Sequence, residues 1–302
     1  MCLVRFALPF AGMKWLLLDG FNLTFRAFYA LPELTRPDGF PTGALHGWSR
    51  LQRSLVEREK PDRVVAFFDL EGSTRHLEIH PEYKANRAET PEPLKRQIPE
   101  VKRLAALMGA RVVARPGVEA DDLIASFSAR RAAAGDEVVI VSADKDFGQC
   151  VGGRVVQLAP SNNPKDPWVR LDAAGIEAKF GVPPERVTDY LALMGDSVDN
   201  IPGIKGVGPK TAAKWIAEYG DIEGVLAAAP RIEPVRFREL LAGSAELLRK
   251  NRTLVTFRTD YPTDEAEAPA ALDFAGLCAF YEAMGMHAAR KDLEKHRQVE
   301  LF

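Results

Sequence analysis

The chain has 302 residues, 46% of them hydrophobic, and its 40 Lys and Arg nearly balance 42 Asp and Glu, which leaves a formal net charge of −2. This composition indicates a globular protein and excludes disordered, collagen-like and disulfide-rich classes. The cysteines are scattered and form no CxxC pair, so neither a zinc site nor a disulfide framework is indicated, and a cytoplasmic location is expected. No apolar run reaches the roughly 20 residues that cross a bilayer, so no membrane partner is expected.

The first residues are apolar but do not fit a signal peptide. Arg5 and Lys14 interrupt the apolar stretch, so the pattern of a secretory signal is only partly met. We therefore interpret residues 1–12 as an N-terminal extension, with Met13 as a candidate true start.

Apolar runs and amphipathic stretches alternate through the first half of the chain, which is typical of a parallel sheet with crossover helices. The expected strands are Trp15–Leu18, Arg63–Phe68, Arg111–Ala114, Glu137–Ser142 and Arg154–Leu158. The expected helices between them are Gly43–Glu59, Leu94–Met108 and Glu119–Ala134. After a turn-rich stretch at 160–167 the strand signals disappear, and helices are expected over 172–258 and at Phe274–Met284. These patterns predict an α/β core at 13–168 and a helical region at 169–302.

Acidic residues follow three of the expected strands. Asp19, Asp69 and the pair Asp144 and Asp146 stand at the carboxyl ends of the strands, where an open parallel sheet has its ligand crevice. A lone acid in such a position is more often a turn former or a helix N-cap. The convergence of several acids on one edge of the sheet instead indicates a shared function.

A further acidic group, Glu119, Asp121 and Asp122, opens an expected helix near the same edge. Helical spacing places Glu119 and Asp122 on one face and turns Asp121 roughly 200° away from Glu119. Crowded carboxylates repel one another and are driven to take up protons unless cations are present. Because all-oxygen ligands suit Mg²⁺ or Mn²⁺ rather than Zn²⁺, the cluster predicts a divalent metal site.

The helical region adds the acidic pair Asp196 and Asp199, whose spacing lets both carboxylates face one way. The segment that follows resembles a helix-hairpin-helix, in which glycines let backbone N–H groups approach a phosphate and lysines add charge. A plain turn between two helices is the alternative. Because the segment adjoins an acidic pair and carries lysines, we expect it to bind the DNA backbone. The expected contacts are Gly203, Lys205, Gly206, Gly208, Lys210, Thr211 and Lys214.

Together these motifs resemble the bacterial 5′ nuclease family, which includes the 5′-to-3′ exonuclease domain of DNA polymerase I and the flap endonucleases, here in a standalone form. The stretches that carry the resemblance are Leu18–Leu23, Phe68-Asp69, Arg75 with Pro81–Arg87, Gly117–Asp122, Ala143–Asp146 and Gly195–Ala212. The resemblance implies a PIN-like nuclease core with a helical arch at about 72–93. It also implies a helix-three-turn-helix module at about 184–220, which binds duplex DNA and holds K⁺ on backbone carbonyls.

The resemblance further implies roles for individual residues. The implied metal ligands, direct or through water, are Asp19, Asp69, Glu119, Asp121, Asp122, Asp144, Asp146, Asp196 and Asp199. In the arch, Lys84 and Arg87 are expected to grip the scissile phosphate and Tyr83 to stack on a terminal base. A solvated charged loop is the alternative for this segment. Arg26 and Arg75 are further candidates for DNA contact.

We therefore expect a monomeric enzyme that uses two or more Mg²⁺ or Mn²⁺ ions to hydrolyse DNA phosphodiester bonds and leaves 5′-phosphate products. The expected substrate is DNA with a 5′ single-stranded flap or a 5′ end next to duplex, and the expected protein partner is a separate DNA polymerase. The prolines of the arch discourage one long helix, so we expect the arch to be loosely ordered until it closes on DNA.

Three other interpretations stay open at this point. A non-catalytic, structure-specific DNA-binding protein would carry the same motifs, and a PIN-type ribonuclease would explain the acidic edge but not the lysine-bearing hairpin. A haloacid-dehalogenase-like phosphatase rests only on Asp144-Lys145-Asp146. Zinc is not expected at His76 and His80, which have no third ligand near in sequence. The near-neutral net charge does not exclude DNA, because the chain is net positive once the predicted metal-site acids are set aside.

Overall fold

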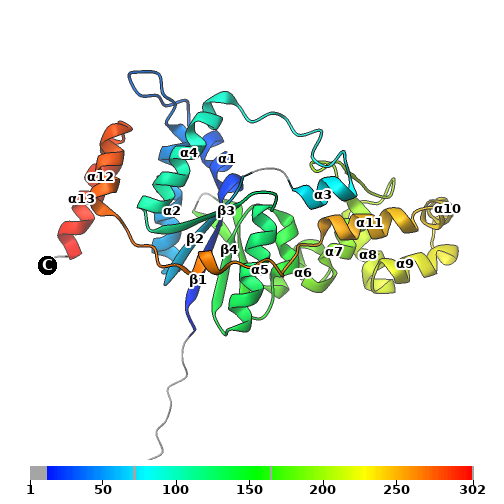
Figure 1. Cartoon of the computed structure of the whole chain (residues 1–302). Coiled ribbons are helices and arrows are strands. Elements are labelled where there is room, and N and C mark those ends of the chain that lie inside the picture. The colour runs from blue at the N-terminus through cyan, green and yellow to red at the C-terminus, as the bar shows by residue number, and fades with distance from the viewer. Residues whose placement is uncertain (1–11, 71–72, 164, 301–302) are drawn as a thin grey trace, which may run out of the picture.

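The computed structural model describes residues 12–70, 73–163 and 165–300, so the predicted N-terminal extension lies almost wholly outside the described residues. Within them, six strands form one sheet in the order β3-β2-β1-β4-β5-β6 (Figure 1). The strands are β1 (Lys14–Asp19), β2 (Arg63–Asp69), β3 (Ala110–Arg115), β4 (Glu137–Val141), β5 (Val155–Asn163) and β6 (Asp166–Leu171). Neighbouring strands are parallel except β5 with β6, which confirms the predicted mostly parallel sheet.

Helices cover both faces of the sheet, because alternate residues of each strand point to opposite sides. The helices of this part are α1 (Gly20–Tyr29), α2 (Gly43–Glu59), α3 (Thr74–Ile79), α4 (Glu92–Leu107) and α5 (Ala120–Ala133). In β1, Leu16 and Leu18 pack into the core shared with α1, α2 and α4, whereas Trp15 and Leu17 pack on the other face with α5. Since both faces are covered, the strand ends are where the sheet can present polar groups to a ligand.

The hairpin formed by β5 and β6 contradicts the expectation that strands end near Leu158. β5 continues to Asn163, and β6 returns antiparallel to it through a register irregularity between Pro160 and Asn163. Proline is tolerated here because Pro160 lies at the irregularity and Pro167 lies on the edge strand, whose open side carries no ladder to interrupt. The segment that looks like a domain boundary in the sequence is part of the core sheet.

The second half of the chain is a helical region, which confirms the predicted C-terminal helical module. It has its own core, in which Leu191, Trp215 and Leu241 are buried. Its helices are α6 (Ala173–Phe180), α7 (Val187–Met194), α8 (Pro209–Tyr219), α9 (Ile222–Ala228), α10 (Arg236–Ala242) and α11 (Ala245–Val255). A short antiparallel pair that was not expected, β7 (Gly195–Asp196) with β8 (Ile201–Pro202), separates α7 from α8. The 3₁₀-helices among the described residues are η1 (Lys145–Cys150), η2 (Pro184–Arg186), η3 (Ala229–Arg231) and η4 (Asp264–Glu267).

After α11 the chain crosses back along the core to α12 (Phe274–Ala283) and α13 (His287–Glu300), at the opposite end of the molecule (Figure 1). We call the crossing segment, residues 256–273, the strap. Phe280 and Met286 lie in the same core cluster as Leu16 of β1. The last two helices therefore pack on the α/β core and not on the helical region that precedes them. None of the helices in the described part of the chain is long and apolar enough to cross a bilayer.

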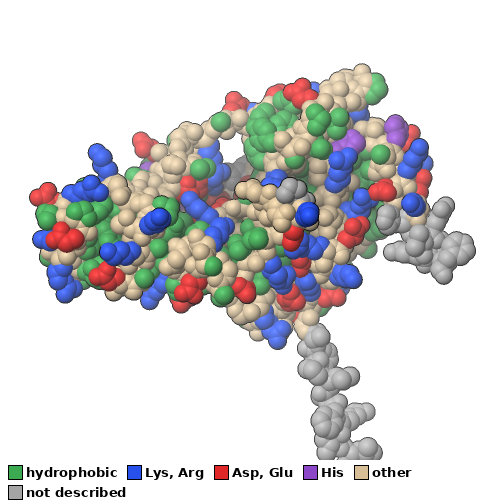
Figure 2. All heavy atoms as spheres, turned by 180° about the vertical axis from the view of Figure 1, so that it is seen from behind, with side chains coloured by type: hydrophobic (Ala, Val, Ile, Leu, Met, Phe, Trp, Pro, Cys, Tyr) green, Lys and Arg blue, Asp and Glu red, His purple; other side chains and the backbone are tan. Residues whose placement is uncertain are grey.

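The segment predicted to form the arch contains α3, a linker at 80–91 and the first turn of α4, and it passes over the sheet edge between the core and the helical region (Figure 1). Proline-containing linker sequence separates the two helices, as expected, although Pro99 lies inside α4. In the space-filling view an opening is visible beneath this chain segment (Figure 2). The arch thus bounds a space above the carboxyl ends of the strands.

Candidate active site

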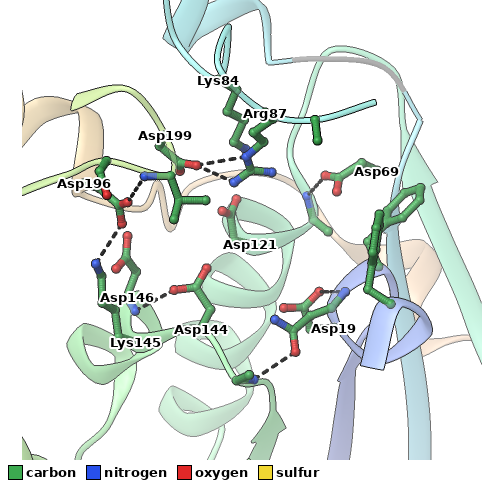
Figure 3. A pocket seen from close by; sticks show the side chains of 18 of the residues that line it. Asp19, Asp69, Lys84, Arg87, Asp121, Asp144, Lys145, Asp146, Asp196 and Asp199 are labelled. Carbon is green, nitrogen blue, oxygen red and sulfur yellow. Dashed lines mark hydrogen bonds and ion pairs between the residues drawn. The ribbon is translucent and has the colours of Figure 1, made fainter. Parts of the chain in front are cut away.

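A pocket of about 750 Å³ lies at the carboxyl ends of the strands, beneath the arch. Seven of the predicted metal ligands line it, and their side chains point toward one another from different elements (Figure 3). The seven are Asp19, Asp69, Asp121, Asp144, Asp146, Asp196 and Asp199. Acids from the α/β core and from the helical region therefore meet in one cavity.

The acids of the sheet edge also serve as local caps. Asp19 ends β1 and accepts a hydrogen bond from the Asn22 N–H at the start of α1, and Asp144 accepts from the Asp146 N–H at the start of η1. Asp69 ends β2 and accepts from the Ala120 N–H, at 2.7 Å, in the first turn of α5. Capping and pocket lining are thus compatible, because each cap uses one carboxylate oxygen. In Asp19 the other oxygen accepts from the Ser142 hydroxyl at 2.6 Å.

The two acids of the helical region reach the pocket because the β7–β8 hairpin is unusually tight. Gly195 has a φ of +69°, and a Cβ on Gly203 would lie 2.0 Å from the carbonyl oxygen of Met194. Only glycine allows the two backbones to approach this closely. The loop between them carries Asp196 and Asp199 back toward the sheet edge.

Burial and mutual repulsion raise the pKa of most of these acids. Burial, with the neighbouring Asp144 and Asp69 charges, raises the pKa of Asp19 to about 7, against the opposing hydrogen bond from Ser142. Burial and nearby carboxylates raise the pKa of Asp121 and of Asp146 well above the ordinary range. Within the described residues, Asp146 Oδ1 is also buried without a hydrogen-bond partner. The pocket therefore holds more negative charge than its own protein groups neutralise.

Basic side chains face the acids across the pocket. Lys84 Nζ lies 2.6 Å from Glu119 Oε1, and Arg87 forms an ion pair with Asp199. Burial opposes the charge on Lys84, but the carboxylates of Glu119 and Asp121 outweigh it and raise the Lys84 pKa. The predicted catalytic pair thus lines the pocket from the arch side (Figure 3).

The sequence reasoning assigned no role to Lys145, whose Nζ lies 2.8 Å from Asp196 Oδ2 in the pocket. Burial favours protonation of Asp196, but this ammonium outweighs it and lowers the Asp196 pKa. Asn22 and Asn86 also line the pocket. The sequence could have indicated that Lys145 lines the pocket, because it stands between two acids at the end of a strand.

Glu119 and Asp122, predicted to hold metal directly or through water, do not line the pocket themselves. Glu119 is 5% exposed and accepts hydrogen bonds from Lys84 and from the Tyr83 hydroxyl. Asp122 is 1% exposed and accepts the Arg258 N–H, at 2.7 Å, from the strap. Helical spacing correctly predicts that Asp121 points away from Glu119, and only Asp121 of the three faces the cavity.

Three candidates for DNA contact have other partners in this structure. Tyr83 is 7% exposed, with its ring stacked on His76 at a centroid distance of 4.5 Å, so it offers no open face to a base. Arg75 donates to the carbonyl oxygens of Thr253 and Thr256 near the end of α11. Arg26 is exposed outside the pocket and lies over the ring of Trp168.

The residues of the predicted DNA-binding hairpin lie on the turn between β8 and α8 and in the first turns of α8. The side chains of Lys205, Lys210 and Lys214 are exposed. Gly208 is the N-cap of α8, with an extended backbone and no side-chain cap. Pro209 has no N–H and the Thr211 N–H donates to the Gly208 carbonyl oxygen, which leaves the Lys210 N–H for another acceptor. Gly203, Gly206 and Thr211 lie on the same segment.

Both halves of the chain match family descriptions of one kind of enzyme. The "5'-3' exonuclease, N-terminal resolvase-like domain" matches residues 14–181, and the "5'-3' exonuclease, C-terminal SAM fold" matches residues 182–274. The chain belongs to the 5′-3′ exonuclease family.

Among its relatives, a 5′-3′ exonuclease of Aquifex aeolicus is 39% identical over 282 residues, which cover 92% of this chain and 94% of that protein. DNA polymerase I of Rhizobium leguminosarum is 38% identical over 84% of this chain and 25% of the polymerase. The thermostable DNA polymerase I of Thermus filiformis is 38% identical over 89% of this chain and 32% of that protein. The chain thus spans about a quarter to a third of these polymerases.

Solved structures share the fold. The T5 D15 protein, co-crystallised with metal ions, has a TM-score of 0.68 at 22% identity, covering 93% of this chain and 98% of that one. The catalytic core of Rad2 in complex with DNA substrate has a TM-score of 0.61 at 15% identity, covering 94% and 91%.

Proposed function

We propose that the protein is a structure-specific 5′-to-3′ exonuclease and 5′-flap endonuclease that hydrolyses DNA phosphodiester bonds with divalent metal ions. The observation that carries the proposal is the pocket itself, in which acids from both halves of the chain face the cations of an arch (Figure 3). The relative in Aquifex aeolicus is named a 5′-3′ exonuclease, and a T5 D15 flap endonuclease has been solved with DNA and metal ions.

The donor set of the pocket fits Mg²⁺ or Mn²⁺. Its donors are carboxylate oxygens, one of which, on Asp146, is buried and unpartnered among the described residues. Within residues 12–70, 73–163 and 165–300, no three Asp, Glu, His or Cys side chains converge closely enough to enclose an ion on their own. Asp19, Asp69, Asp121, Asp144, Asp146, Asp196 and Asp199 would therefore hold the ions together with water and substrate oxygens, as is usual for Mg²⁺.

The chain's own groups divide the work of phosphodiester hydrolysis between two sides of the pocket. Divalent ions held by the acids of the pocket would supply the Lewis acidity that activates the attacking water and stabilises the leaving oxygen. Lys84 and Arg87 come from the arch and neutralise charge on the scissile phosphate. Their ion pairs with Glu119 and Asp199 hold both cations over the pocket before DNA arrives.

The hairpin module provides the contact to duplex DNA. Lys205, Lys210 and Lys214 attract the phosphate backbone, and the Lys210 N–H at the start of α8 offers a donor to a phosphate oxygen. Binding of K⁺ by backbone carbonyls of this module, a monomeric state, a cytoplasmic location and partnership with a separate DNA polymerase are further parts of the proposal.

The test is product sizing on 5′-labelled flap, nicked and blunt DNA, with a matched RNA flap, in Mg²⁺ and in EDTA. Cleavage of the DNA flap near its junction and stepwise 5′ trimming, both abolished by EDTA, are the expected results. Binding without cleavage would support a DNA-binding protein instead, and preferred cleavage of the RNA flap would support a ribonuclease.

A further inference from the structure

His76 is a nearly buried histidine that lies outside the acidic pocket, with both ring nitrogens engaged. It is 3% exposed on α3, with Nε2 3.0 Å from the carbonyl oxygen of Leu254 and Nδ1 2.6 Å from Ser73 Oγ. A carbonyl oxygen only accepts hydrogen bonds, so Nε2 carries a hydrogen, and Nδ1 can accept from the Ser73 hydroxyl. The imidazole is therefore fixed between the start of α3 and the end of α11.

The face of this fixed ring supports Tyr83. The two rings stack at a centroid distance of 4.5 Å and an interplanar angle of 16°. The ammonium of Lys84 lies 4.7 Å from the centroid of the Tyr83 ring. The Tyr83 hydroxyl donates to Glu119 Oε2, and Lys84 Nζ donates to Glu119 Oε1. His76, Tyr83, Lys84 and Glu119 thus form one connected group that leads from α11 to the pocket.

The backbone of Lys84 also needs support from its surroundings. Its φ is +59°, in the left-handed region that a non-glycine residue rarely adopts. Such a conformation persists only when neighbouring contacts over-determine it. The Lys84 N–H donates to the Asp199 carbonyl oxygen at 3.1 Å, and the stack holds the preceding residue.

We propose that His76 is a positioning residue for cleavage: by fixing the ring of Tyr83, it sets the position of the Lys84 ammonium over the pocket. The inference rests on the proposed function, in which Lys84 acts on the scissile phosphate. Because Leu254 belongs to α11, the stack ties the position of Lys84 to the helical region that would bind DNA. His76 itself does not touch the phosphate.

The test compares His76→Gln with His76→Phe under single-turnover conditions on 5′-flap DNA in Mg²⁺. His76→Gln keeps a hydrogen-bond donor for the Leu254 carbonyl but loses the aromatic face, so kcat should fall on the order of 10- to 100-fold. A loss of this size is expected when a reacting group is misplaced by about 1 Å. His76→Phe keeps the aromatic face but loses the two hydrogen bonds that fix it, so it should lose clearly less of kcat than His76→Gln. DNA affinity measured in Ca²⁺ should stay within about twofold for both, because the phosphate contacts of the hairpin are untouched.

A double-mutant cycle separates positioning from general destabilisation. In a Lys84→Ala background, His76→Gln should cost little further activity, because the group that it positions is already absent. Met286→Ala, in the core between β1 and α12, is the control for lost stability and should keep the wild-type kcat at temperatures where it is folded. Full kcat in His76→Gln, or the same loss with and without Lys84, would overturn the inference. Failure of the proposed function would appear separately, as an absence of cleavage by the wild-type protein.

Discussion

Asp121 and Asp122 are neighbours in α5 whose carboxylates have opposite surroundings. Asp121 faces the pocket, where burial and other carboxylates raise its pKa, whereas Asp122 faces the strap and accepts the Arg258 N–H. One side chain therefore faces the proposed site of chemistry and the other forms a hydrogen bond within the fold. Substituting each in turn separates the two roles at adjacent positions.

Asp121→Asn should reduce the rate of Mg²⁺-dependent cleavage by more than roughly 10- to 100-fold, which is the loss expected when only an outer-shell partner of a metal is removed. Its thermal stability in EDTA should rise, because one repelling charge is removed from the pocket. Asp122→Ala should cost about 1 kcal/mol of unfolding free energy, because it removes the acceptor of the part-buried Arg258 N–H. Denaturant melts and single-turnover assays on both variants measure these effects. The reverse pattern, with Asp122 critical for chemistry and Asp121 for stability, would show that the roles are misassigned.

The raised pKa of Asp19 predicts how metal-free stability depends on pH. Its pKa rises from an unfolded value of 3.8 to about 7, so the folded state binds this proton more tightly than the unfolded state. The stability that this proton adds to the folded state is fully present below the unfolded pKa of 3.8 and is lost as the pH rises to the folded pKa of about 7. In EDTA the melting temperature should therefore be higher at about pH 6 than at about pH 8, and Asp19→Asn should shrink the difference.

Divalent ions should reverse the trend, because carboxylate ligands must be deprotonated to bind them. Mn²⁺ should therefore raise the melting temperature more at about pH 8 than at about pH 6. Thermal melts at both pH values, with EDTA and with Mn²⁺, check this. A metal-free melting temperature that rises with pH over this range, equally in wild type and Asp19→Asn, would contradict the charge excess assigned to the pocket.

At the scale of elements, the arch linker is tied to the β7–β8 hairpin. Asn86 Nδ2 donates to the Ser197 carbonyl oxygen at 2.6 Å, and Asn200 Nδ2 donates to the Glu82 carbonyl oxygen at 2.8 Å. His80 Nε2 lies 2.8 Å from the Asn200 carbonyl oxygen. These contacts place the arch in a defined position over the pocket, although exposed hydrogen bonds of this kind are individually weak.

Asn86→Ala should therefore loosen the arch in the absence of DNA. Limited proteolysis should cut the linker at 80–91 several-fold faster than in wild type, since loop opening tracks the loss of such contacts. Adding flap DNA should protect both proteins as the arch closes on the single strand. Asn162→Ala, in the exposed β5–β6 hairpin, is the matched control. Equal cutting of Asn86→Ala and wild type, or no protection by DNA, would count against this role of the arch.

The elements that the sequence predicts well are those with strong local signals. The apolar runs of β1, β2 and β4 specify buried strands, and topology then brings Asp19, Asp69 and Asp144 to one edge. β6 is not predicted from the sequence, because its prolines are typical of a turn. Prolines are tolerated in an edge strand, but the edge position of β6 is known only from the whole sheet. The sequence also does not predict that Glu119 and Asp122 are buried, because their hydrogen-bond partners, Lys84 and the Arg258 N–H, are distant in sequence. The stack of Tyr83 on His76 likewise depends on the fold.

At the scale of the molecule, the site takes its acids from the α/β core and from the helical region, and the strap runs from the end of the helical region back along the core. The strap docks on α5 through Arg258 and Tyr261, whose backbone N–H groups bond Asp122 and Ser126, and on β3 through the ion pair of Glu265 with Arg115. The helical region also contacts the core directly, since α7 packs against η1, and Asp196 and Asp199 reach the pocket from it. The exposed lysines of the hairpin then lie on the same body as part of the acidic pocket.

Those lysines should control DNA affinity and not the chemical step. Replacing Lys205, Lys210 and Lys214 with Ala should weaken binding to flap DNA and reduce the slope of log affinity against log salt by about 1 per lost phosphate contact. Single-turnover kcat at saturating DNA should stay near the wild-type value. Lys291→Ala, on the exposed face of α13, is the control. A salt slope unchanged in the triple variant would contradict the assignment of the hairpin to the phosphate backbone.

The central claim is that the acids of the pocket hold the catalytic metal ions. Anomalous diffraction from crystals soaked in Mn²⁺ tests it most directly. We expect two peaks in the pocket, roughly 3.5 to 4 Å apart, one nearer Asp19, Asp69 and Asp121 and the other nearer Asp144, Asp146, Asp196 and Asp199. Mn²⁺ bound only outside this pocket, in a protein that still cleaves flap DNA in Mn²⁺, would contradict the account.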